Sequence, residues 1–367
     1  MLTLGTGGTI ASSYKVDERG RRPVYSTEQV LNFVPRLYDI ANITIDAPLR
    51  DGLGNPSYID SSNMQPENSQ EIARKIFRGY REGAQAVVVL GGTDTMEEYA
   101  AYLASMLPYK KIPVVVTGSM EPIDQPNSDG INNISNAVKF AALGISGTYI
   151  VFDKRIIAGS SAKKMDPVAR DAFTSISFPE IGTVTDSEIK LNDEAVQKVK
   201  LQTQKFEHKE MALLDRFGKY SIHLLELYMG FNPWIIDMLF RNGYKGLIIE
   251  AFGTGGVPGT PPDTSIMHKI EQWRDDRFIG ITSQTFRGQV TPEYEVNIRA
   301  QQAGAISLRD MLPKTAVAKA TWAFGQTDNV NDVKKLMLYP FENEINGQSV
   351  VENERTTDEE VERILKQ

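Results

Sequence analysis

Two short stretches of the sequence place a threonine directly after a glycine-rich turn. "LGTGGTIAS", over Leu4–Ser12, carries Thr9, and "LGGTDTMEEYA" carries Thr93 and Asp94. Ile10 stands where a dinucleotide-binding GxGxxG motif needs glycine or alanine, and no lysine completes a P-loop, so neither phosphate-binding motif fits. A threonine hydroxyl can instead act as a nucleophile when a neighbouring group takes its proton.

Each motif alone is also explained by a tight turn, with Thr93 or Asp94 as the cap of the following helix. Both motifs follow strand-like runs, however, and open α/β sheets bind ligands at the carboxyl ends of their strands. If the two strands are parallel, two hydroxyls and a carboxylate meet in one crevice. The pair of motifs therefore favours a catalytic site.

Two further stretches carry groups suited to the same site. "YIDSSNM" places Ser61 and Ser62 just before a helix that starts with proline, where hydroxyls and free amides favour a carboxylate ligand. "AGSSAKKMD" carries Lys163 and Lys164 in a loop after a strand. A lysine acts as a base only when it is neutral, which requires desolvation or nearby positive charge. A solvated loop is the alternative interpretation of both lysines.

The composition excludes several other kinds of site. The 367 residues include no cysteine, and the three histidines, His208, His223 and His268, lie far apart. Disulfides, thiolate or histidine metal sites and a Ser-His-Asp triad are therefore not expected, and we predict no metal and no other cofactor.

Charge and hydropathy restrict the partners. A net charge of −7 argues against a nucleic-acid partner. The sequence has no apolar run of about eighteen residues, which argues against a membrane helix. Met1 leads into a strand-like run without the basic and apolar regions of a signal peptide, so a cytoplasmic protein is expected.

Alternating strand and helix patterns predict an α/β fold. The runs 86–90, 113–118 and 148–152 are typical of strands buried on both faces. Stretches with helical spacing lie before and between them, the first from Pro66 to Gly83. This order implies a parallel sheet with right-handed crossovers. We expect a larger N-terminal parallel-sheet domain and a smaller C-terminal α/β domain.

The same patterns suggest domain boundaries. Residues 1–185 form the expected N-terminal domain with both threonines. The charged, weakly apolar residues 186–218 form an expected linker, with a strand or hairpin within it as the alternative. Strand and helix patterns resume over 219–345, the expected second domain. Residues 346–367 are expected to be an acidic tail or a terminal helix, with Thr357 and Glu360 as its capping box.

These motifs, in this order, resemble the bacterial-type L-asparaginase family over nearly the whole chain. Its two signature motifs are similar to "GTGGTIAS" and "LGGTDTMEEYA", and between and after them come "DSSNMQPE", "VVVTGSMEPIDQPNSDGINNISNAV" and "GSSAKKMDPVARDAF". Further along, "IIEAFGTGGVP" and "ITSQTFRGQVTPEYEV" are similar to the cytosolic, type I branch. The resemblance implies an asparaginase-like fold and a homodimer or homotetramer.

The resemblance also implies the catalytic roles. Thr9 matches the nucleophile that attacks the side-chain amide carbon of L-asparagine, and Thr93 with Lys164 matches the second threonine and its lysine. Lys164 fits better than Lys163 because it lies five residues after Gly159. The implied reaction yields L-aspartate and ammonia through a threonyl ester, which divides one difficult hydrolysis into two easier steps. Backbone N–H groups at the two turns would stabilise the oxyanion.

The substrate-binding residues follow from the same comparison. Asp94 matches the residue that holds the α-ammonium group of the substrate, beside Thr93. Ser61 and Ser62 match the positions that hold the α-carboxylate and neighbouring groups.

One departure concerns the tyrosine that the family places beside the nucleophile, on a mobile segment. Arg21 occupies that position here, and Tyr14 and Tyr25 are the nearest phenols. The charged segment 12–26 suits a loop that closes over substrate, and we expect a phenol from Tyr14 or Tyr25 to reach Thr9 when it closes. Tyr14 is preferred because only four residues separate it from Thr9. Activation of the nucleophile through water, or through the second threonine and its lysine, is the alternative.

A second departure lies in the C-terminal half. Gly256 stands where several relatives carry an asparagine donated by the neighbouring subunit, and Glu293 or Glu295 is the candidate for a partner carboxylate.

Two other functions compete with asparagine hydrolysis. The amidase subunit of a tRNA-dependent amidotransferase carries a small domain before its nucleophile, whereas the nucleophile here is residue nine. A small-molecule sensor would keep the pocket but has no need of the lysine.

Overall fold

The chain folds into two compact units, Met1–Leu214 and Asp215–Gln367, in the computed structural model. The structure describes residues 1–16, 18, 20–108, 110–185, 187–203, 212–218, 221–261, 265–345 and 356–366. His208, the middle of the expected linker and residues 346–355 of the expected tail lie outside these ranges.

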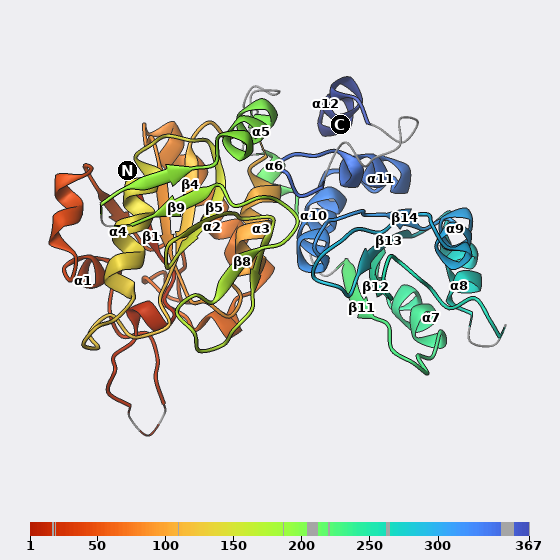
Figure 1. The fold of residues 1–367 in the computed structure, drawn as a ribbon, viewed down its shortest axis with the longest axis horizontal. Helices are drawn as coiled ribbons and strands as arrows, with labels where there is room; N and C mark the ends of the chain where they lie inside the picture. The colour runs from red at the N-terminus through yellow and green to blue at the C-terminus, as the bar shows by residue number, and fades with distance from the viewer. Residues whose placement is uncertain are drawn as a thin grey trace. The chain divides into compact units, whose positions relative to one another are not determined.

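An eight-stranded sheet forms the centre of the first unit, in the order β10-β9-β6-β5-β4-β3-β1-β2 (Figure 1). The strands β2, β1, β3, β4 and β5 pair in parallel, and β6, β9 and β10 pair antiparallel. The expected strands are confirmed as β3, β4 and β5. The bounds are β1 (Leu2–Gly5), β2 (Thr44–Asp46), β3 (Val87–Leu90), β4 (Pro113–Thr117), β5 (Gly147–Phe152), β6 (Arg155–Ala158), β9 (Gly182–Val184) and β10 (Ile189–Leu191).

Helices cover both faces of this sheet, with α1 and α4 on one side and α2 and α3 on the other (Figure 1). Pro66 occupies the first turn of α2, where the missing N–H costs no hydrogen bond, and Ile72 and Ile76 are buried one turn apart. The bounds are α1 (Thr27–Leu31), α2 (Pro66–Arg81), α3 (Met96–Met106), α4 (Gly130–Ala141), α5 (Asp193–Thr203) and α6 (Ala212–Asp215).

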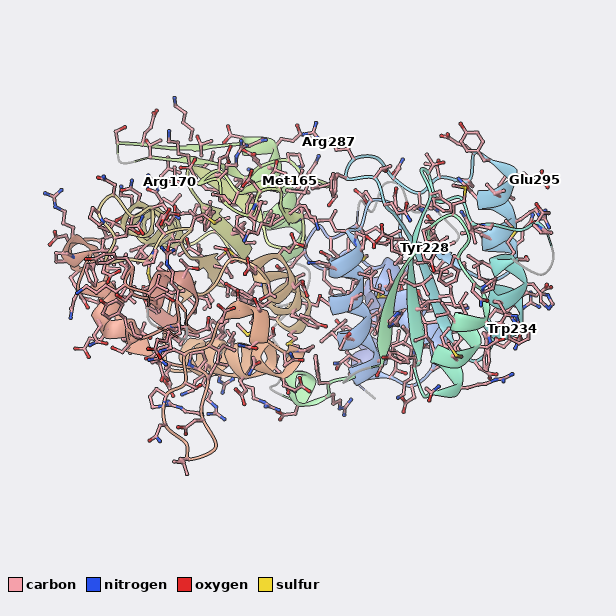
Figure 2. The ribbon with its side chains drawn as sticks, turned by 90° about the horizontal axis from the view of Figure 1, so that it is seen from below. Met165, Arg170, Tyr228, Trp234, Arg287 and Glu295 are labelled. Carbon is pink, nitrogen blue, oxygen red and sulfur yellow. The ribbon has the colours of Figure 1, made fainter. Side chains whose placement is uncertain are left out.

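A separate two-stranded sheet, β7 (Ala162–Lys164) with β8 (Phe173–Ser175), carries both candidate lysines. The ring of Phe173 packs against Phe152 of β5 at a centroid distance of 4.9 Å. Arg155 at the start of β6 holds both carboxylate oxygens of Asp171, at 2.7 and 3.0 Å. These contacts fasten the hairpin to the main sheet, while its connecting turn, with Met165, lies at the surface (Figure 2).

Part of the expected linker belongs to the first unit instead. β10 pairs with β9, and α5 packs Ala195, Val196 and Val199 into the same core as β3 and β4. The helical spacing of these three apolar residues supplies a buried stripe that a solvated linker would lack.

A smaller parallel sheet, β11-β12-β13-β14, forms the centre of the second unit. The α/β fold class is therefore confirmed, with two sheets of unequal size. The bounds are β11 (Ile222–Glu226), β12 (Gly246–Ala251), β13 (Phe278–Ser283), β14 (Ile306–Ser307), α7 (Trp234–Arg241), α8 (Ile266–Trp273), α9 (Glu295–Gln302), α10 (Pro313–Gln326), α11 (Val330–Leu338) and α12 (Asp358–Leu365). Within the described ranges, no helix has both the length and the apolar character needed to cross a bilayer.

The terminal helix α12 docks against the second unit. Thr357 caps it through a capping box with Glu360, and Val361 and Ile364 are buried. Lys335 on α11 donates to the Glu360 carboxylate at 2.6 Å; this contact and the Thr357 amide lower the pKa of Glu360 to about 2. The terminal helix is thus held by charge as well as by apolar packing.

A buried ion pair anchors the chain just after α11. Lys319 on α10 is 1% exposed and donates to Glu344 Oε1 at 2.6 Å and to the carbonyl oxygens of Met337 and Tyr339 at 2.9 and 2.6 Å. Glu344 also accepts the N–H of Phe341 at 2.9 Å. Burial lowers the pKa of Lys319, and the Glu344 charge opposes that shift.

We expect Lys319→Met to lower the free energy of unfolding by about 3–5 kcal/mol, because it leaves the Glu344 carboxylate buried without its cation. Urea denaturation measures the effect. Lys366→Met is the control, since Lys366 pairs with Glu362 in solvent and its loss should cost less than about 1 kcal/mol. Equal destabilisation by the two variants would contradict the role given to the buried pair.

Candidate active site

The turn after β1 presents Thr9. Gly7 and Gly8 have φ of +111° and +78°, values that glycine adopts without strain, and Thr9 then opens a short 3-10 helix that runs to Ala11. The buried Ile10 anchors this helix in the core, while Thr9 itself is half-buried. The Thr9 hydroxyl is therefore presented on a turn, between two glycines that shape it and a buried isoleucine that anchors it.

The turn after β3, which presents Thr93, touches the Thr9 turn. A Cβ atom on Gly8 would lie 2.2 Å from the Cα of Gly92, and one on Gly92 would lie 2.5 Å from Ser61 Oγ. No side chain fits at either position. The glycines thus let the two turns approach backbone to backbone, and the structure brings both threonine motifs together.

Lys164 reaches the second turn from the β7–β8 hairpin. Its Nζ lies 2.9 Å from Thr93 Oγ1 and 2.7 Å from Asp94 Oδ1. The lysine side chain is 13% exposed and the aspartate side chain is 62% exposed, so the cation lies inside and the carboxylate faces solvent. A hydroxyl, a cation and an accessible carboxylate therefore share one small site.

Lys163 points to a different partner, the buried carboxylate of Glu97 in the first turn of α3. Lys163 Nζ lies 3.1 Å from Glu97 Oε1, and the backbone N–H of Lys164 donates to Glu97 Oε2 at 2.6 Å. The sequence interpretation missed Glu97. The sequence could have indicated Glu97 through its spacing, because it lies four residues after Thr93, about one helical turn along the chain.

Ser61 and Ser62 differ in their surroundings. Ser61 is buried, its Oγ accepts the N–H of Asp94 at 3.2 Å, and its carbonyl accepts the Thr95 hydroxyl at 2.9 Å. Ser62 is exposed, and its N–H donates to the Asp60 carboxylate. Ser61 is thus part of the threonine site, whereas Ser62 lies at its solvent side.

Some backbone N–H groups of the two turns already have a hydrogen-bond acceptor, and others do not. The N–H of Gly8 donates to Ile59 O at 2.8 Å, and that of Asp94 is taken by Ser61. The N–H groups of Thr9 and Thr93 have no acceptor in the part of the chain that the structure describes. Two free donors on adjoining turns suit an oxyanion.

The two candidate phenols have different partners. The Tyr25 hydroxyl donates to Asp124 Oδ2 at 2.9 Å, and this contact, helped by burial, raises the pKa of the phenol. Tyr14 is 44% exposed, and its hydroxyl has no hydrogen-bond partner among the described residues. Neither phenol is hydrogen-bonded to Thr9, and Arg21 is exposed. Asp124 was missed from the sequence, although it lies in the loop after β4.

The remaining candidates belong to the second unit. The N–H of Gly256 donates to Phe252 O at 2.7 Å in the turn after β12. Glu295 begins α9 at the surface (Figure 2) and pairs with Arg299 at 3.5 Å, while Glu293 is exposed.

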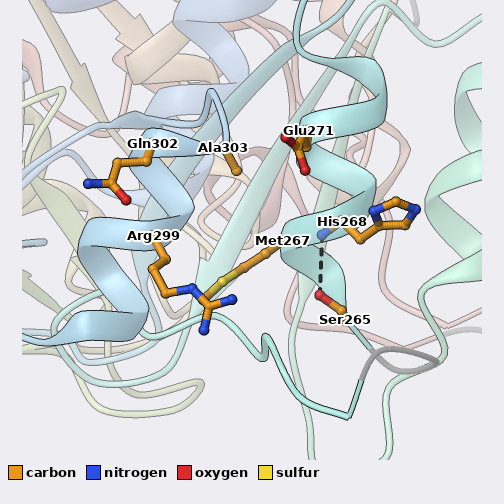
Figure 3. A pocket seen from close by; sticks show the side chains of 7 residues that line it. All are labelled: Ser265, Met267, His268, Glu271, Arg299, Gln302 and Ala303. Atoms are coloured by element: carbon orange, nitrogen blue, oxygen red, sulfur yellow. Dashed lines mark hydrogen bonds between the residues drawn. The ribbon is translucent and has the colours of Figure 1, made fainter.

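A pocket of about 330 Å³ in the second unit contains none of the predicted residues. It lies between α8 and α9, where Ser265 Oγ accepts the N–H of His268 at 3.2 Å (Figure 3). The described residues form no group of three or more His, Asp or Glu side chains placed to hold a metal ion.

Comparison with known proteins agrees with this architecture. Residues 1–197 match the family model "Asparaginase, N-terminal", and residues 221–337 match "Glutaminase/Asparaginase C-terminal domain". A subunit of the glutamyl-tRNA(Gln) amidotransferase from Metallosphaera sedula is 34% identical over 91% of this chain and 74% of its own length. An L-asparaginase from Thermococcus kodakarensis is 31% identical over 95% of this chain and 99% of its own.

Solved structures show the same fold. The thermostable L-asparaginase from Thermococcus kodakarensis superposes with a TM-score of 0.77 at 29% identity, over 94% of this chain and 99% of that one. A probable cytoplasmic L-asparaginase from Campylobacter jejuni gives a TM-score of 0.73 at 24% identity, over 92% and 98%, a likeness of fold alone.

The two α/β units, with paired threonine turns in the first, define an amidohydrolase of the asparaginase type. The chain belongs to the asparaginase family, since the two family models together cover most of it.

We expect Gly8→Ala to abolish catalysis, because the added methyl group would push the Thr9 turn away from Gly92. Gly54→Ala is the matched control, since Gly54 has a φ of +85° but no atom within 4 Å of its Cβ position. The control should cost only the strain of its φ, about 1 kcal/mol of stability. Thermal unfolding and the rate of ammonia release separate the two effects; similar activity in both variants would contradict the requirement for close approach.

Proposed function

We propose that the protein hydrolyses the side-chain amide of L-asparagine to L-aspartate and ammonia, with Thr9 as the nucleophile. The observation that carries this proposal is the 2.9 Å contact between Lys164 Nζ and Thr93 Oγ1, beside the turn that presents Thr9. Membership of the asparaginase family supports the reaction class.

In the proposed first step, Thr9 Oγ attacks the amide carbon and loses its proton to a neighbouring acceptor. The free N–H groups of Thr9 and Thr93 stabilise the oxyanion, typically by on the order of 3 kcal/mol for each donor. Collapse of the tetrahedral intermediate breaks the C–N bond, and the leaving nitrogen takes a proton to depart as ammonia. A threonyl ester remains.

In the second step, water attacks the ester and releases L-aspartate. The pair of Thr93 and Lys164 is suited to orient this water and to move its proton, since the two groups are within hydrogen-bond distance. Tyr14 is our candidate for the proton acceptor of Thr9, because the Tyr25 phenol already donates to Asp124.

Substrate binding uses the exposed edge of the site. Asp94 presents its carboxylate to solvent and suits the α-ammonium group, while Ser61 and Ser62 suit the α-carboxylate. We also propose that the protein is a cytoplasmic homodimer or homotetramer of the type I branch, without a nucleic-acid or membrane partner.

The second candidate function is that of an amidase subunit in a tRNA-dependent amidotransferase, which the relatives named as amidotransferase subunits favour. A sensor without chemistry is the third. Ammonia release from free L-asparagine, measured with L-glutamine as the competing substrate, distinguishes the proposed enzyme from the sensor. Turnover of free asparagine supports the proposal; binding without ammonia release would support a sensor.

We expect Thr9→Ala and Thr93→Ala each to lower kcat by about a hundredfold or more while the fold stays intact. Both hydroxyls lie on turns, so their loss removes little packing. The coupled ammonia assay gives the rate, and circular dichroism checks the fold. Either folded variant that keeps more than about a few per cent of the wild-type kcat contradicts its assigned role.

Lys164→Met should reduce kcat far more than Lys163→Met, because only Lys164 lies within hydrogen-bond distance of Thr93. The two substitutions remove the same charge from adjacent residues, so each serves as the control for the other. The expected ratio is about a hundredfold. Equal losses would show that the position of the base has been assigned incorrectly.

A further inference from the structure

Asp124 accepts three hydrogen bonds from the two ends of the segment that follows Thr9. Its Oδ2 accepts from Ser13 Oγ at 2.8 Å and from the Tyr25 hydroxyl at 2.9 Å, and its Oδ1 accepts from the Tyr14 N–H at 2.8 Å. We propose that Asp124 is a positioning residue for Thr9, an inference that rests on the proposed function. Its carboxylate fastens both ends of this segment to the loop after β4.

The loop that carries Asp124 is itself held firmly. Asp129, just before α4, accepts the N–H groups of Met120 and Glu121 at 2.9 and 3.0 Å. Ile123, the neighbour of Asp124, is buried in the core of the first unit. The carboxylate therefore projects from a fixed platform, and the segment after Thr9 is fastened to it.

The fastened ends connect directly to the short helix that Thr9 opens. The carbonyl of Ala11, at the end of this helix, accepts the N–H of Val24 at 2.8 Å and that of Tyr25 at 2.9 Å. Because Ala11 lies two residues after Thr9, a displacement of the segment is transmitted to the nucleophile.

Charge favours the same arrangement. Burial acts to raise the pKa of Asp124, but the hydrogen bonds from Ser13, Tyr14 and Tyr25 outweigh it and lower the pKa. The residue is therefore a carboxylate at neutral pH and a strong acceptor. Its contact with Tyr25 keeps that phenol as a donor, which leaves the Tyr14 hydroxyl available.

The two ends of the segment depend on Asp124 to different degrees. The Tyr25 ring also packs edge-on against Phe33 at a centroid distance of 5.9 Å, so packing would hold this end without the carboxylate. The other end would lose both the Ser13 and the Tyr14 hydrogen bonds. Removal of the carboxylate should therefore release Tyr14 and leave Tyr25 nearly in place.

The test combines limited trypsin digestion with steady-state kinetics in Asp124→Ala. Arg21 is exposed within the segment, and we expect cleavage after it to be at least about tenfold faster than in the wild type, without a change in the thermal midpoint. We expect kcat for ammonia release to fall about tenfold and KM to change less. Asp124→Asn keeps one acceptor oxygen and should recover part of both effects.

Asp51→Ala is the matched control, since Asp51 also accepts backbone N–H groups, those of Leu53 and Asn55, in an exposed turn. It should leave cleavage after Arg21 and kcat unchanged. Cleavage of Asp124→Ala at the wild-type rate would overturn the inference, as would a fall in kcat fully accounted for by lower global stability.

Two further outcomes remain decisive. If Asp124→Ala does not fold, Asp124→Asn must accelerate cleavage in its place, because its amide nitrogen cannot accept a hydrogen bond from either end of the segment, and failure to do so overturns the inference. If the wild type releases no ammonia, the proposed function fails, and the cleavage rates alone then decide whether Asp124 fastens the segment.

Discussion

The close approach of Gly8 and Gly92 is the constraint on which the rest of the site depends. β1 and β3 are neighbours in a parallel sheet, so their carboxyl ends lie side by side, but ordinary side chains would still hold the two turns apart. Without Cβ atoms the backbones touch, and the residue after each glycine pair is a threonine. Both turns share the Gly-Gly-Thr pattern because the close approach of their backbones excludes a side chain on either turn.

Two carboxylates, those of Glu97 and Asp124, hold the parts of the site that the two glycine turns do not position. Glu97 joins the start of α3 to β7 through the Lys163 side chain and the Lys164 backbone N–H. This contact holds the hairpin where the Lys164 side chain reaches Thr93. Asp124 does the same for the segment after the first threonine. Both act between parts of the chain that are far apart in sequence. Both also accept backbone N–H groups, which only a substitution by proline removes from the partner.

The features predicted from the sequence are those that local patterns encode. The buried runs of β3, β4 and β5 are continuous and apolar, and the proline at the start of α2 marks its first turn, so these elements follow from spacing and turn chemistry.

Glu97 and Asp124 could not be found in the same way. An acidic residue in the first turn of a helix is normally a solvated partner of the helix dipole, and only the lysine hairpin, 67 residues away, makes Glu97 a buried acceptor. The partners of Asp124 lie 99 to 111 residues away. Likewise, the residues after 186 resemble a charged linker because the core that buries α5 is built by distant strands.

The β7–β8 register has a consequence for insertions and deletions. A one-residue slip in a strand turns every side chain to the other face, and β7 pairs with β8 over only three residues, Ala162–Lys164. Because two lysines stand in succession, the slip that moves Lys163 into the place of Lys164 keeps a cation beside the threonine, whereas the opposite slip would place Met165 there. The doubled lysine therefore gives the hairpin a tolerance to a one-residue slip in one direction, which a single lysine would not provide.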